Sequence, residues 1–467
     1  MSFFLREQMT KDLRYFLKEV EDKQPNDFVR IKKEVDPKFE LCGVIRKFQD
    51  DGRYPLVYFE KVRGSKFPVV SNLFASKSRL ALGFGVNEST LVKDYMANED
   101  KKIPSKMSSD GPVKENIIKG DNLDLGFLPH ITHNEKDAGP YITSGVSVFK
   151  DPDTGAYDTG IFRLMYKGKN KFGVLYGDYS KAMHVIRKFE SKGKPTEMAF
   201  FIGHHPASTL TSQTKVPLGM DEFSVMGGLL GEPVDLVQCE TVDLHVPAFA
   251  EIVIEGHVLA EVREPEAPFG EYTWYYGLER MSHVLEVTAV THRNNAIYHD
   301  IFSAHADHNM AAKVQREAVV YKRIKLAVPS IKDVELPLSG TCRHIAYVSI
   351  KKDYDGLGKI ASLSALSADP MIKIAIIVDD DINVHNEQEV MWAVATRVQA
   401  DRALTIVPEA YVAELDPSAY SIRSRADRGS LNTKWAIDAT KPIDQPFQES
   451  ADVPKQYWKS IDISNYL

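Results

Sequence analysis

The stretch whose residue types could do chemistry most directly is EPEAPFGEYTW, residues 264–274. It places three glutamates and three aromatic side chains among Pro265, Pro268 and Gly270. Prolines and glycine oppose a regular helix and weaken a strand, so we expect a shaped loop that presents its side chains. Glu266 and Glu271 would face one pocket if this loop curls. The alternative, from this stretch alone, is a solvated acidic turn.

Two other segments carry groups that could act with these glutamates. Residues 158–165 read DTGIFRLM, and residues 221–241 read DEFSVMGGLLGEPVDLVQCET. The guanidinium of Arg163 offers a planar set of donors that suits a carboxylate. Considered alone, Arg163 would be interpreted as a surface arginine on a strand.

The length, composition and net charge of the chain indicate the kind of protein that must hold these groups. A chain of 467 residues predicts two or three domains with hydrophobic cores. A hydrophobic fraction of 43% and a charged fraction of 26% are typical of globular proteins. A net charge of -7 argues against a nucleic-acid partner and favours a small molecule.

The spacing of the cysteines and the distribution of apolar residues indicate the cellular compartment of the protein. Cys42, Cys239 and Cys342 lie far apart, which argues against a disulfide framework and against a zinc cluster. The first 22 residues contain no apolar core of signal-peptide length, and no run of 18 apolar residues occurs. We therefore expect a cytoplasmic protein without a membrane span.

The pattern of the chain predicts three units, at 1–120, 121–320 and 321–467. In the first, apolar residues at helical spacing predict a helix over 10–22 opened by Thr10. Strands are predicted at 28–35 and 56–62, a helix ending at glycine at 77–86, and a connection over 97–120.

Short alternating segments separated by turn residues predict a β-rich second unit, a barrel or a sandwich with one helix at 180–192. Its expected strands lie at 143–151, 159–167, 196–203, 251–262 and 285–293. The third unit alternates between helix and strand, with a buried strand at 372–382 and a helix at 387–399. This alternation is typical of an α/β unit.

Several familiar motifs are absent, including GxGxxG, GxxxxGK[ST], HExxH and GxSxG, which argues against nucleotide-binding, zinc-protease and serine-hydrolase activities. His305 and His308 could be a metal pair, but loop histidines more often form ordinary hydrogen bonds. The same holds for His204 and His205.

Taken together, the segments at 158–165, 221–241 and 266–271 resemble the UbiD family of reversible, non-oxidative decarboxylases that use prenylated FMN. DLRYFL at 12–17, KIAIIVDDDI at 373–382 and VMWAVATR at 390–397 also resemble family sequences, so the resemblance covers most of the chain. It implies an α/β (α+β) fold in which a central split β-barrel, the flavin-binding domain, is flanked by N-terminal and C-terminal α/β units. It also implies a site in the cleft between the barrel and the N-terminal unit.

The resemblance implies a catalytic trio of Arg163, Glu266 and Glu271. Arg163 and an ionised Glu266 would orient the substrate, and Glu271 would protonate the carbon that loses CO2. That role requires a protonated carboxyl group, which burial and a like-charged neighbour favour. All three residues of the trio are present. Their presence argues against two alternatives, an FMN-dependent oxidoreductase on the same barrel and a non-catalytic ligand-binding protein.

The sequence departs from the family at the implied metal site. The positions of the family's asparagine, histidine and glutamate ligands are occupied here by Asp158, Lys181 and Glu222. An ammonium has no lone pair to give a metal, so binding of a divalent cation such as manganese, and of potassium, is in doubt. Either His184, three residues later on the same helix, supplies the nitrogen, or Lys181 itself replaces part of the cation's role. The second is favoured.

The resemblance also implies cofactor contacts, partners and an oligomeric state. Cofactor contacts are assigned to Thr159, Gly160, Ile161, Phe162, Arg163, Lys181, Ser212, Thr214, Glu222 and Lys373. The expected partners are a small aromatic acid, CO2, and a flavin prenyltransferase that supplies the cofactor. A homodimer or homohexamer is expected, with the aromatic tail 457–467 as a clasp on a neighbouring subunit. The identity of the acid and the direction of the reaction stay open.

Overall fold

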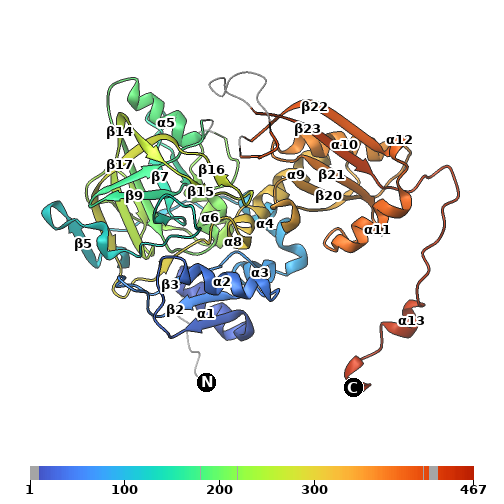
Figure 1. Cartoon of the computed structure of the whole chain (residues 1–467), viewed down its shortest axis with the longest axis horizontal. Coiled ribbons are helices and arrows are strands. Elements are labelled where there is room, and N and C mark those ends of the chain that lie inside the picture. Colours follow the sequence, from blue (N-terminus) through green and yellow to red (C-terminus); the bar gives the residue numbers. More distant parts are fainter. Residues whose placement is uncertain (1–9, 179, 218, 414, 420–429, 467) are drawn as a thin grey trace.

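A computed structural model of the chain describes residues 10–178, 180–217, 219–413, 415–419 and 430–466. It is a mixed α/β protein in which three units follow one another along the chain. In Figure 1 the N-terminal unit lies below a large central sheet, and the C-terminal unit lies beside both.

The N-terminal unit packs helices around a small sheet in the order β1-β2-β3-β18. Its first helix buries Leu13, Phe16, Leu17 and Val20, as the spacing predicts. The predicted start at Thr10 is wrong, because the side chain of Asp12 accepts from the backbone N–H of Tyr15 and caps the helix. The elements are α1 (Leu13–Lys23), β1 (Phe28–Ile31), α2 (Glu40–Asp50), β2 (Leu56–Phe59), β3 (Val69–Ser71), α3 (Lys77–Phe84) and α4 (Leu91–Glu99).

The central unit is built on a nine-stranded sheet, ordered β6-β9-β10-β17-β14-β11-β7-β8, with β5 pairing with β17. Its strands are β5 (Asn116–Lys119), β6 (Tyr141–Ile142), β7 (Val146–Lys150), β8 (Tyr157–Ile161), β9 (Leu164–Gly168), β10 (Lys171–Val174), β11 (Thr196–Ile202), β14 (Ile252–Glu266) and β17 (Arg280–His292). Among the described residues, no ladder closes this sheet between its two end strands, β6 and β8. The split barrel therefore stays an expectation, although the strands that predict it are present.

Both faces of this sheet are buried. In β11, Ala199 and Phe201 belong to one hydrophobic core, while Met198, Phe200 and Ile202 belong to another. Successive side chains of a strand point to opposite faces, so the uninterrupted apolar run of β11 divides between two cores. A rigid, doubly covered sheet is a suitable support for functional groups at its strand ends.

Smaller elements surround the central sheet. Two helices, α5 and α7, begin beside β8, and short sheets form at β13-β12-β4 and β15-β16. The elements are β4 (Lys106–Met107), α5 (Lys181–Glu190), α6 (Ala207–Thr211), α7 (Glu222–Leu230), β12 (Asp235–Gln238), β13 (His245–Pro247), β15 (Phe269–Gly270), β16 (Tyr276–Gly277) and β18 (Tyr298–His299). The stretch predicted as a connection, 97–120, thus holds two short strands.

The C-terminal unit is a five-stranded sheet, ordered β19-β20-β21-β23-β22. Alternate residues of β21 face two cores: Ala375 and Ile377 pack with α9 and α10, and Ile376 and Val378 pack with α11. The elements are α8 (Ala306–Met310), α9 (Lys313–Ala327), β19 (Ile331–Glu335), β20 (Ile345–Ile350), α10 (Leu357–Ala368), β21 (Ile374–Asp379), α11 (Glu387–Arg397), α12 (Ala400–Ala403), β22 (Leu404–Val412), β23 (Ser430–Asp438) and α13 (Lys455–Trp458).

Helix α9 belongs to two cores at once. Val314 and Ala318, in its first half, pack into the core shared with the N-terminal unit and the central sheet. Val320 and Ile324, in its second half, pack into the core of the C-terminal unit. The helix is therefore the packed connection between the units (Figure 1).

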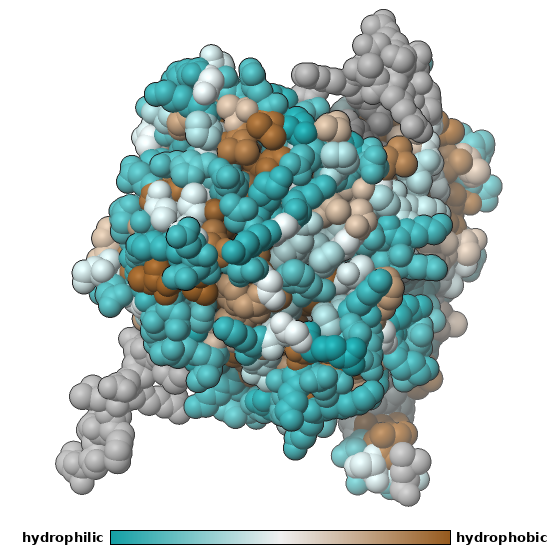
Figure 2. Space-filling view, turned by 60° about the vertical axis from the view of Figure 1, so that its left-hand side comes forward, coloured by the Kyte–Doolittle hydropathy of each residue, from teal (hydrophilic) through white to brown (hydrophobic). Residues whose placement is uncertain are grey.

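The surface is mostly hydrophilic on the side seen in Figure 2, where apolar residues gather in a few small patches. In Figure 1 the segment that ends in α13 extends away from the body of the molecule, and its Tyr457 and Trp458 are exposed. A search of the described residues finds no helix with the length and apolar character needed to cross a membrane.

Candidate active site

Arg163 stands at a break between two strands. The sequence predicts one strand over 159–167, but the structure ends β8 at Ile161 and begins β9 at Leu164, with Phe162 and Arg163 between them. The two strands run in different parts of the sheet, β8 beside β7 and β9 beside β10. The break therefore holds Arg163 between two anchored strands rather than in the middle of one.

The two glutamates come from the end of β14 and the residue after β15. Contrary to the predicted loop, β14 continues through Pro265 to Glu266, where it pairs with Arg280 of β17. Glu271 follows Gly270, and its backbone N–H donates to the carbonyl of Tyr275 at 2.9 Å, closing a tight turn. The strand end and the turn thus deliver carboxylates from two directions.

Arg163 joins both carboxylates. Its Nε and Nη2 donate to Oε1 and Oε2 of Glu266 at 2.8 and 2.9 Å, and its Nη1 donates to Oε1 of Glu271. Burial lowers the pKa of Arg163, but the adjacent Glu271 and Glu266 outweigh burial, so its pKa lies above the usual value. The guanidinium is permanently charged and is fixed in direction by the two-point contact with Glu266.

An apolar wall supports the trio from one side. The ring of Phe269 lies 4.7 Å from the guanidinium carbon of Arg163, and Tyr141 packs on Phe269 with ring centroids 4.6 Å apart. A cation above an aromatic face gains electrostatic energy, and more so away from water. The wall therefore restricts Arg163 and excludes solvent from its carboxylate partners.

Two glycines leave room for the loop that carries Glu271. A Cβ on Gly270 would lie 2.3 Å from Nδ2 of Asn134, and the Gly270 N–H donates to Asp137 at 2.8 Å. A Cβ on Gly277 would lie 2.9 Å from Oε1 of Glu271. At these two positions a side chain would displace the loop or the carboxylate.

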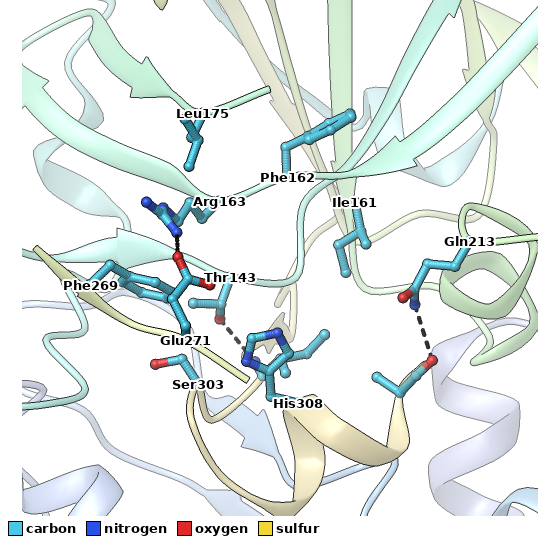
Figure 3. A pocket seen from close by; sticks show the side chains of 12 residues that line it. Thr143, Ile161, Phe162, Arg163, Leu175, Gln213, Phe269, Glu271, Ser303 and His308 are labelled. Atoms are coloured by element: carbon cyan, nitrogen blue, oxygen red, sulfur yellow. Dashed lines mark hydrogen bonds and ion pairs between the residues drawn. The ribbon is translucent and has the colours of Figure 1, made fainter. Parts of the chain in front are cut away.

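The trio opens onto a cavity of about 190 Å³, shown in Figure 3. Arg163 and Glu271 lie at one end, and Gln213 and His308 approach from other segments. The lining residues are Thr143, Ile161, Phe162, Arg163, Leu175, Gln213, Phe269, Glu271, Ile301, Ser303, His308 and Ala311. None belongs to the N-terminal unit, so the predicted position of the site between the barrel and that unit gains no support from this cavity and stays a prediction. The cavity lies between the central sheet and the start of α8 and α9.

A wider groove of about 740 Å³ continues from the cavity and shares Arg163, Leu175 and Glu271 with it. Its other walls include Ser180 at the start of α5, Arg187 in the last turn of that helix, and Tyr411 of the C-terminal unit. The cavity and groove together provide an elongated space with the trio at their junction.

A second cluster of one base and two acids lies at the other end of β8. The Nζ of Lys181 donates to Oδ1 of Asp158 and to Oε1 of Glu222, both at 2.7 Å. The N–H and the hydroxyl of Thr159 donate to the other oxygen of Glu222 at 2.7 and 2.6 Å. Oδ2 of Asp158 is buried without a hydrogen-bond partner. We call Lys181, Asp158 and Glu222 the lysine cluster.

Electrostatics keep Lys181 charged in this cluster. Burial lowers its pKa, but Glu222 and Asp158 more than compensate, so the pKa is raised. Burial also raises the pKa of Glu222 to about 7, against the opposing effect of Lys181. His184 is exposed on α5 and is not a partner of either acid in the described part of the chain.

The donor set does not fit a divalent cation. A protonated amine, not a lone pair, occupies the point where the two carboxylates converge. Within the described ranges, no group of three or more His, Cys, Asp or Glu side chains is placed to hold a metal ion. The expected alternative, with His184 as the third ligand, has no support from the position of that side chain.

Of the other residues predicted to contact the cofactor, some lie at the cavity and others direct their side chains to the backbone. Ile161 and Phe162 line the cavity, and Gly160 has no room for a Cβ, which would lie 2.5 Å from Phe162. By contrast, Ser212 and Thr214 turn their hydroxyls to the backbone carbonyls of Thr209 and Leu210, at 2.8 and 3.0 Å.

Lys373 does not line the cavity or the groove. Its Nζ donates to Ser418 and lies 3.3 Å from Oδ2 of Asp416, so its recorded contacts are within the C-terminal unit. The structure does not bring this lysine together with the residues of the central sheet.

The histidines singled out in the sequence serve different purposes. His308 lines the cavity, where burial and nearby arginines lower its pKa to about 3, whereas His305 stacks on Phe302 at 4.0 Å. Burial lowers the pKa of His204 to about 4 and of His205 to about 3, and His205 bonds the carbonyl of Gly83 at 3.1 Å. His204 and His205 are neutral core residues.

Several cavity residues are missed by reasoning from the sequence, notably Thr143, Gln213 and Ser303. Gln213 lies between Ser212 and Thr214, the two residues of this segment that are predicted to contact the cofactor, and it is the one of the three that lines the cavity. Thr143 and Ser303 had no signal, because each is an ordinary polar residue near a strand end.

Comparisons with protein families agree along the whole chain. Three domain models of 3-octaprenyl-4-hydroxybenzoate carboxy-lyase, UbiD, match in order: the N-terminal domain over residues 21–98, the Rift-related domain over 105–306 and the C-terminal domain over 309–439.

Among curated relatives, anhydromevalonate phosphate decarboxylase of Methanothermobacter thermautotrophicus is 34% identical over 424 residues, 90% of this chain and 96% of the relative. Phenolic acid decarboxylase of Sedimentibacter hydroxybenzoicus is 31% identical over 458 residues, 93% of this chain and 92% of the relative.

Among solved structures, the UbiD-class enzyme HmfF from Pelotomaculum thermopropionicum in complex with FMN has a TM-score of 0.91 and 40% identity, covering 98% of this chain and 100% of that chain. An evolved dimeric form of HmfF, in complex with prenylated FMN, has a TM-score of 0.88 and 37% identity over 98% of this chain and 100% of that chain.

Proposed function

The chain belongs to the UbiD family of carboxy-lyases, and on that premise we propose that it catalyses the reversible, non-oxidative decarboxylation of an unsaturated carboxylic acid with prenylated FMN. The substrate class that we propose is an aromatic or heteroaromatic acid, or an α,β-unsaturated one. The observation that carries the proposal is the contact of Arg163 with both Glu266 and Glu271 at the mouth of a buried cavity.

The space beside the trio supports a flavin of this kind. Ile161, Phe162 and Leu175 give the cavity flat apolar walls, and the groove extends it past the start of α5. When bound, prenylated FMN supplies the electron sink that decarboxylation at an unsaturated carbon needs. Thr159, Gly160, Ile161 and Phe162 would hold it along β8, with the lysine cluster beyond one end.

In this proposal Arg163 and Glu266 orient the substrate. The two-point contact with Glu266 fixes the plane of the guanidinium, and the cavity side of Arg163 faces the space where a carboxylate would enter. The pairing also holds Glu266 as a carboxylate acceptor. A fixed donor set lowers the cost of ordering the substrate before reaction.

Glu271 is the proton donor in this proposal. With Glu266 ionised, Arg163 is already neutralised, so a proton on Oε2 of Glu271 makes the trio neutral in its buried setting. That proton would pass to the carbon that loses CO2, and in the reverse direction Glu271 would take it back. Burial of the pair from water protects the proton from exchange with solvent.

The substrate must suit a cavity with apolar walls and few polar groups. Phe162 and Phe269 offer aromatic surfaces, while Thr143, Gln213 and Ser303 offer hydrogen bonds. These features support a flat acid with a small number of polar substituents. The relatives named above act on a phenolic acid and on anhydromevalonate phosphate, so both aromatic and acyclic unsaturated acids belong in a substrate panel.

The decisive experiment compares Glu271→Gln with Glu264→Gln. Both variants are made in cells that also produce a flavin prenyltransferase, and CO2 release and proton exchange are measured across a panel of unsaturated acids. We expect Glu271→Gln to lower both rates by about 10² to 10⁴. Glu264, which pairs with Lys171 at 2.7 Å outside the cavity, is the matched control and should leave them unchanged.

Two results would overturn the proposal. Undiminished CO2 release and exchange in Glu271→Gln would remove Glu271 from the reaction. Unmodified FMN as the only flavin that supports turnover, identified by absorption and mass, would favour the alternative of an FMN-dependent oxidoreductase on the same fold.

We further propose the remaining expectations as properties of this enzyme: a cytoplasmic location, the division into units at 1–120, 121–320 and 321–467, and assembly as a homodimer or homohexamer. The exposed Tyr457 and Trp458 support the tail as a contact between subunits, although Leu467, its last residue, lies outside the described residues. Size-exclusion chromatography with light scattering, on the whole chain and on a chain ending at residue 441, tests the assembly.

A further inference from the structure

The lysine cluster has the geometry of a filled cation site. Oδ1 of Asp158 and Oε1 of Glu222 both lie 2.7 Å from the Nζ of Lys181. The side chains of Asp158 and Glu222 are 1% and 2% exposed, whereas that of Lys181 is 23% exposed, so the lysine is the part of the cluster that reaches solvent. Two buried carboxylates are thus neutralised in part by a covalently tethered cation.

The positions of the three residues make this contact a fixed one. Lys181 is the first residue of α5, whose cap Ser180 accepts from the N–H of Met183. Glu222 is the first residue of α7, whose cap Asp221 accepts from the N–H of Phe223. Asp158 is the second residue of β8, which pairs with β7. The ammonium therefore ties two helix starts to one strand of the central sheet.

The hydrogen-bond inventory of Lys181 leaves one donor for a ligand. An ammonium has three N–H donors, and two are used by Asp158 and Glu222. Glu222 is satisfied on its other oxygen by Thr159, while Oδ2 of Asp158 has no partner among the residues that the structure describes. An open donor beside an unpartnered buried acceptor indicates that a polar ligand completes the cluster.

Strand β8 connects this cluster with the catalytic trio. Asp158 and Arg163 are five residues apart, a distance on the order of 15 Å along extended backbone. The groove that shares Arg163 and Glu271 with the cavity is also lined by Ser180 and Met183, which lie one position before and two positions after Lys181. The lysine cluster therefore adjoins this wall of the groove, although its three residues are not among the lining residues. The flavin phosphate would lie at this wall.

We propose that Lys181 is a built-in cation that replaces the divalent metal of the family's usual site, so that this enzyme binds its flavin phosphate without a metal ion. The proposal rests on the function proposed above and concerns how that cofactor is held. A metal held by a neutral amide, a neutral imidazole and one carboxylate leaves a net charge of +1, whereas the lysine cluster has a formal charge of −1. A metal ion would have to displace the ammonium from both carboxylates.

The first test uses the wild-type enzyme and unmodified FMN. The protein is stripped of flavin, treated with EDTA, and titrated with FMN by fluorescence quenching with and without added Mn²⁺. We expect the two dissociation constants to agree within about twofold, and elemental analysis to find no stoichiometric transition metal. Binding that needs Mn²⁺ overturns the proposal.

Variants then locate the effect at Lys181. Lys181→Met should weaken FMN binding by at least about tenfold, with no rescue by Mn²⁺. Lys181→His restores an imidazole at this position and should make FMN binding respond to Mn²⁺, with a bound-Mn²⁺ signal in electron paramagnetic resonance. Lys188→Met is the matched control, because Lys188 lies on the same helix and pairs with Asp151 at 2.9 Å away from the cluster; its FMN affinity should equal that of the wild type.

The outcomes separate this inference from the proposed function. If the wild type binds FMN only with a metal, or if Lys181→Met binds FMN as the wild type does, Lys181 is not the anchor, and the carboxy-lyase proposal stands. If the wild type binds no flavin under any condition while circular dichroism shows it folded, the cofactor premise itself fails.

Discussion

Two clusters at opposite ends of β8 share one composition, a single basic side chain between two buried carboxylates, yet differ in geometry. Arg163 contacts Glu266 at two points and Glu271 at one, from a break between strands. Lys181 contacts Asp158 and Glu222 at one point each, from the start of a helix. The first arrangement fixes the direction of a planar group, and the second places a charge at a point.

The difference in geometry suits the two clusters to different tasks. The arginine has a rigid planar set of donors and contacts two inequivalent acids, which suits the orienting role proposed for it. The lysine has two equivalent contacts and its pKa is raised, against burial, by both acids, so it serves as a permanent charge. Exchanging the two bases should therefore damage different properties.

The largest effect is expected for Arg163→Lys. A lysine keeps the charge but loses the two-point contact with Glu266, so we expect turnover to fall by about 10² to 10³ while FMN affinity changes by less than about threefold. Steady-state kinetics and flavin titration measure the two quantities. A variant with normal turnover would show that charge alone is sufficient at this end of β8.

The reverse exchange, Lys181→Arg, should have a smaller and different effect. A planar guanidinium is longer than the ammonium and cannot take its place between Asp158 and Glu222 without moving α5 or α7. We expect FMN affinity to fall by about tenfold, with turnover per bound cofactor unchanged. Lost turnover in fully loaded enzyme would mean that the two clusters are not independent.

A still smaller effect is expected from Gly277→Ala. The added methyl would meet Oε1 of Glu271 at 2.9 Å, so the carboxylate must shift by a few tenths of an ångström and its contact with Arg163 loosens. We expect a loss of turnover of about fivefold. Gly43→Ala in α2, where a Cβ meets nothing within 4 Å, is the control for a glycine substitution as such.

The smallest expected effect is the pH dependence of stability that comes from His204, a buried histidine outside both clusters. It must be subtracted before the pH dependence of the two clusters is compared. Burial lowers the pKa of His204 to about 4, so between its unfolded value near 6.5 and about pH 4 the unfolded chain binds the extra proton and stability falls as the pH falls. The full loss is about 3 kcal/mol. His204→Leu should reduce the fall in Tm over this range, whereas replacing the exposed His184 should not.

Much of the fold could be predicted from local patterns. The spacing of Leu13, Phe16, Leu17 and Val20 predicts α1, because the helix buries one periodic set of side chains. The short apolar segment at 196–203 predicts β11, whose side chains are buried on both faces of the sheet. The break at Phe162 could not be predicted, since TGIFRLMYK reads as one strand. It is set by the partners of β8 and β9, which lie in different parts of the sheet.

Only some residues of the candidate site could be predicted from the sequence, because the others come together only in the folded chain. The family resemblance carried by short segments implies Arg163, Glu266 and Glu271, and it draws attention to Lys181 because a lysine stands where that resemblance implies a histidine. Thr143, Gln213 and Ser303 line the same cavity but come from segments separated by tens of residues, and their convergence depends on tertiary packing. The contact of Lys373 with Asp416 could not be predicted either, because the two residues lie 43 positions apart in the sequence.

Helix α9, shared by two cores, has a mechanical consequence for the enzyme. His308 and Ala311 form part of the cavity wall, and they lie directly before the half of α9 that is anchored in the first core. The far half of that helix is embedded in the C-terminal unit. A displacement of the C-terminal unit, for example by a neighbouring subunit that packs on it, would therefore reach the cavity wall through this single helix.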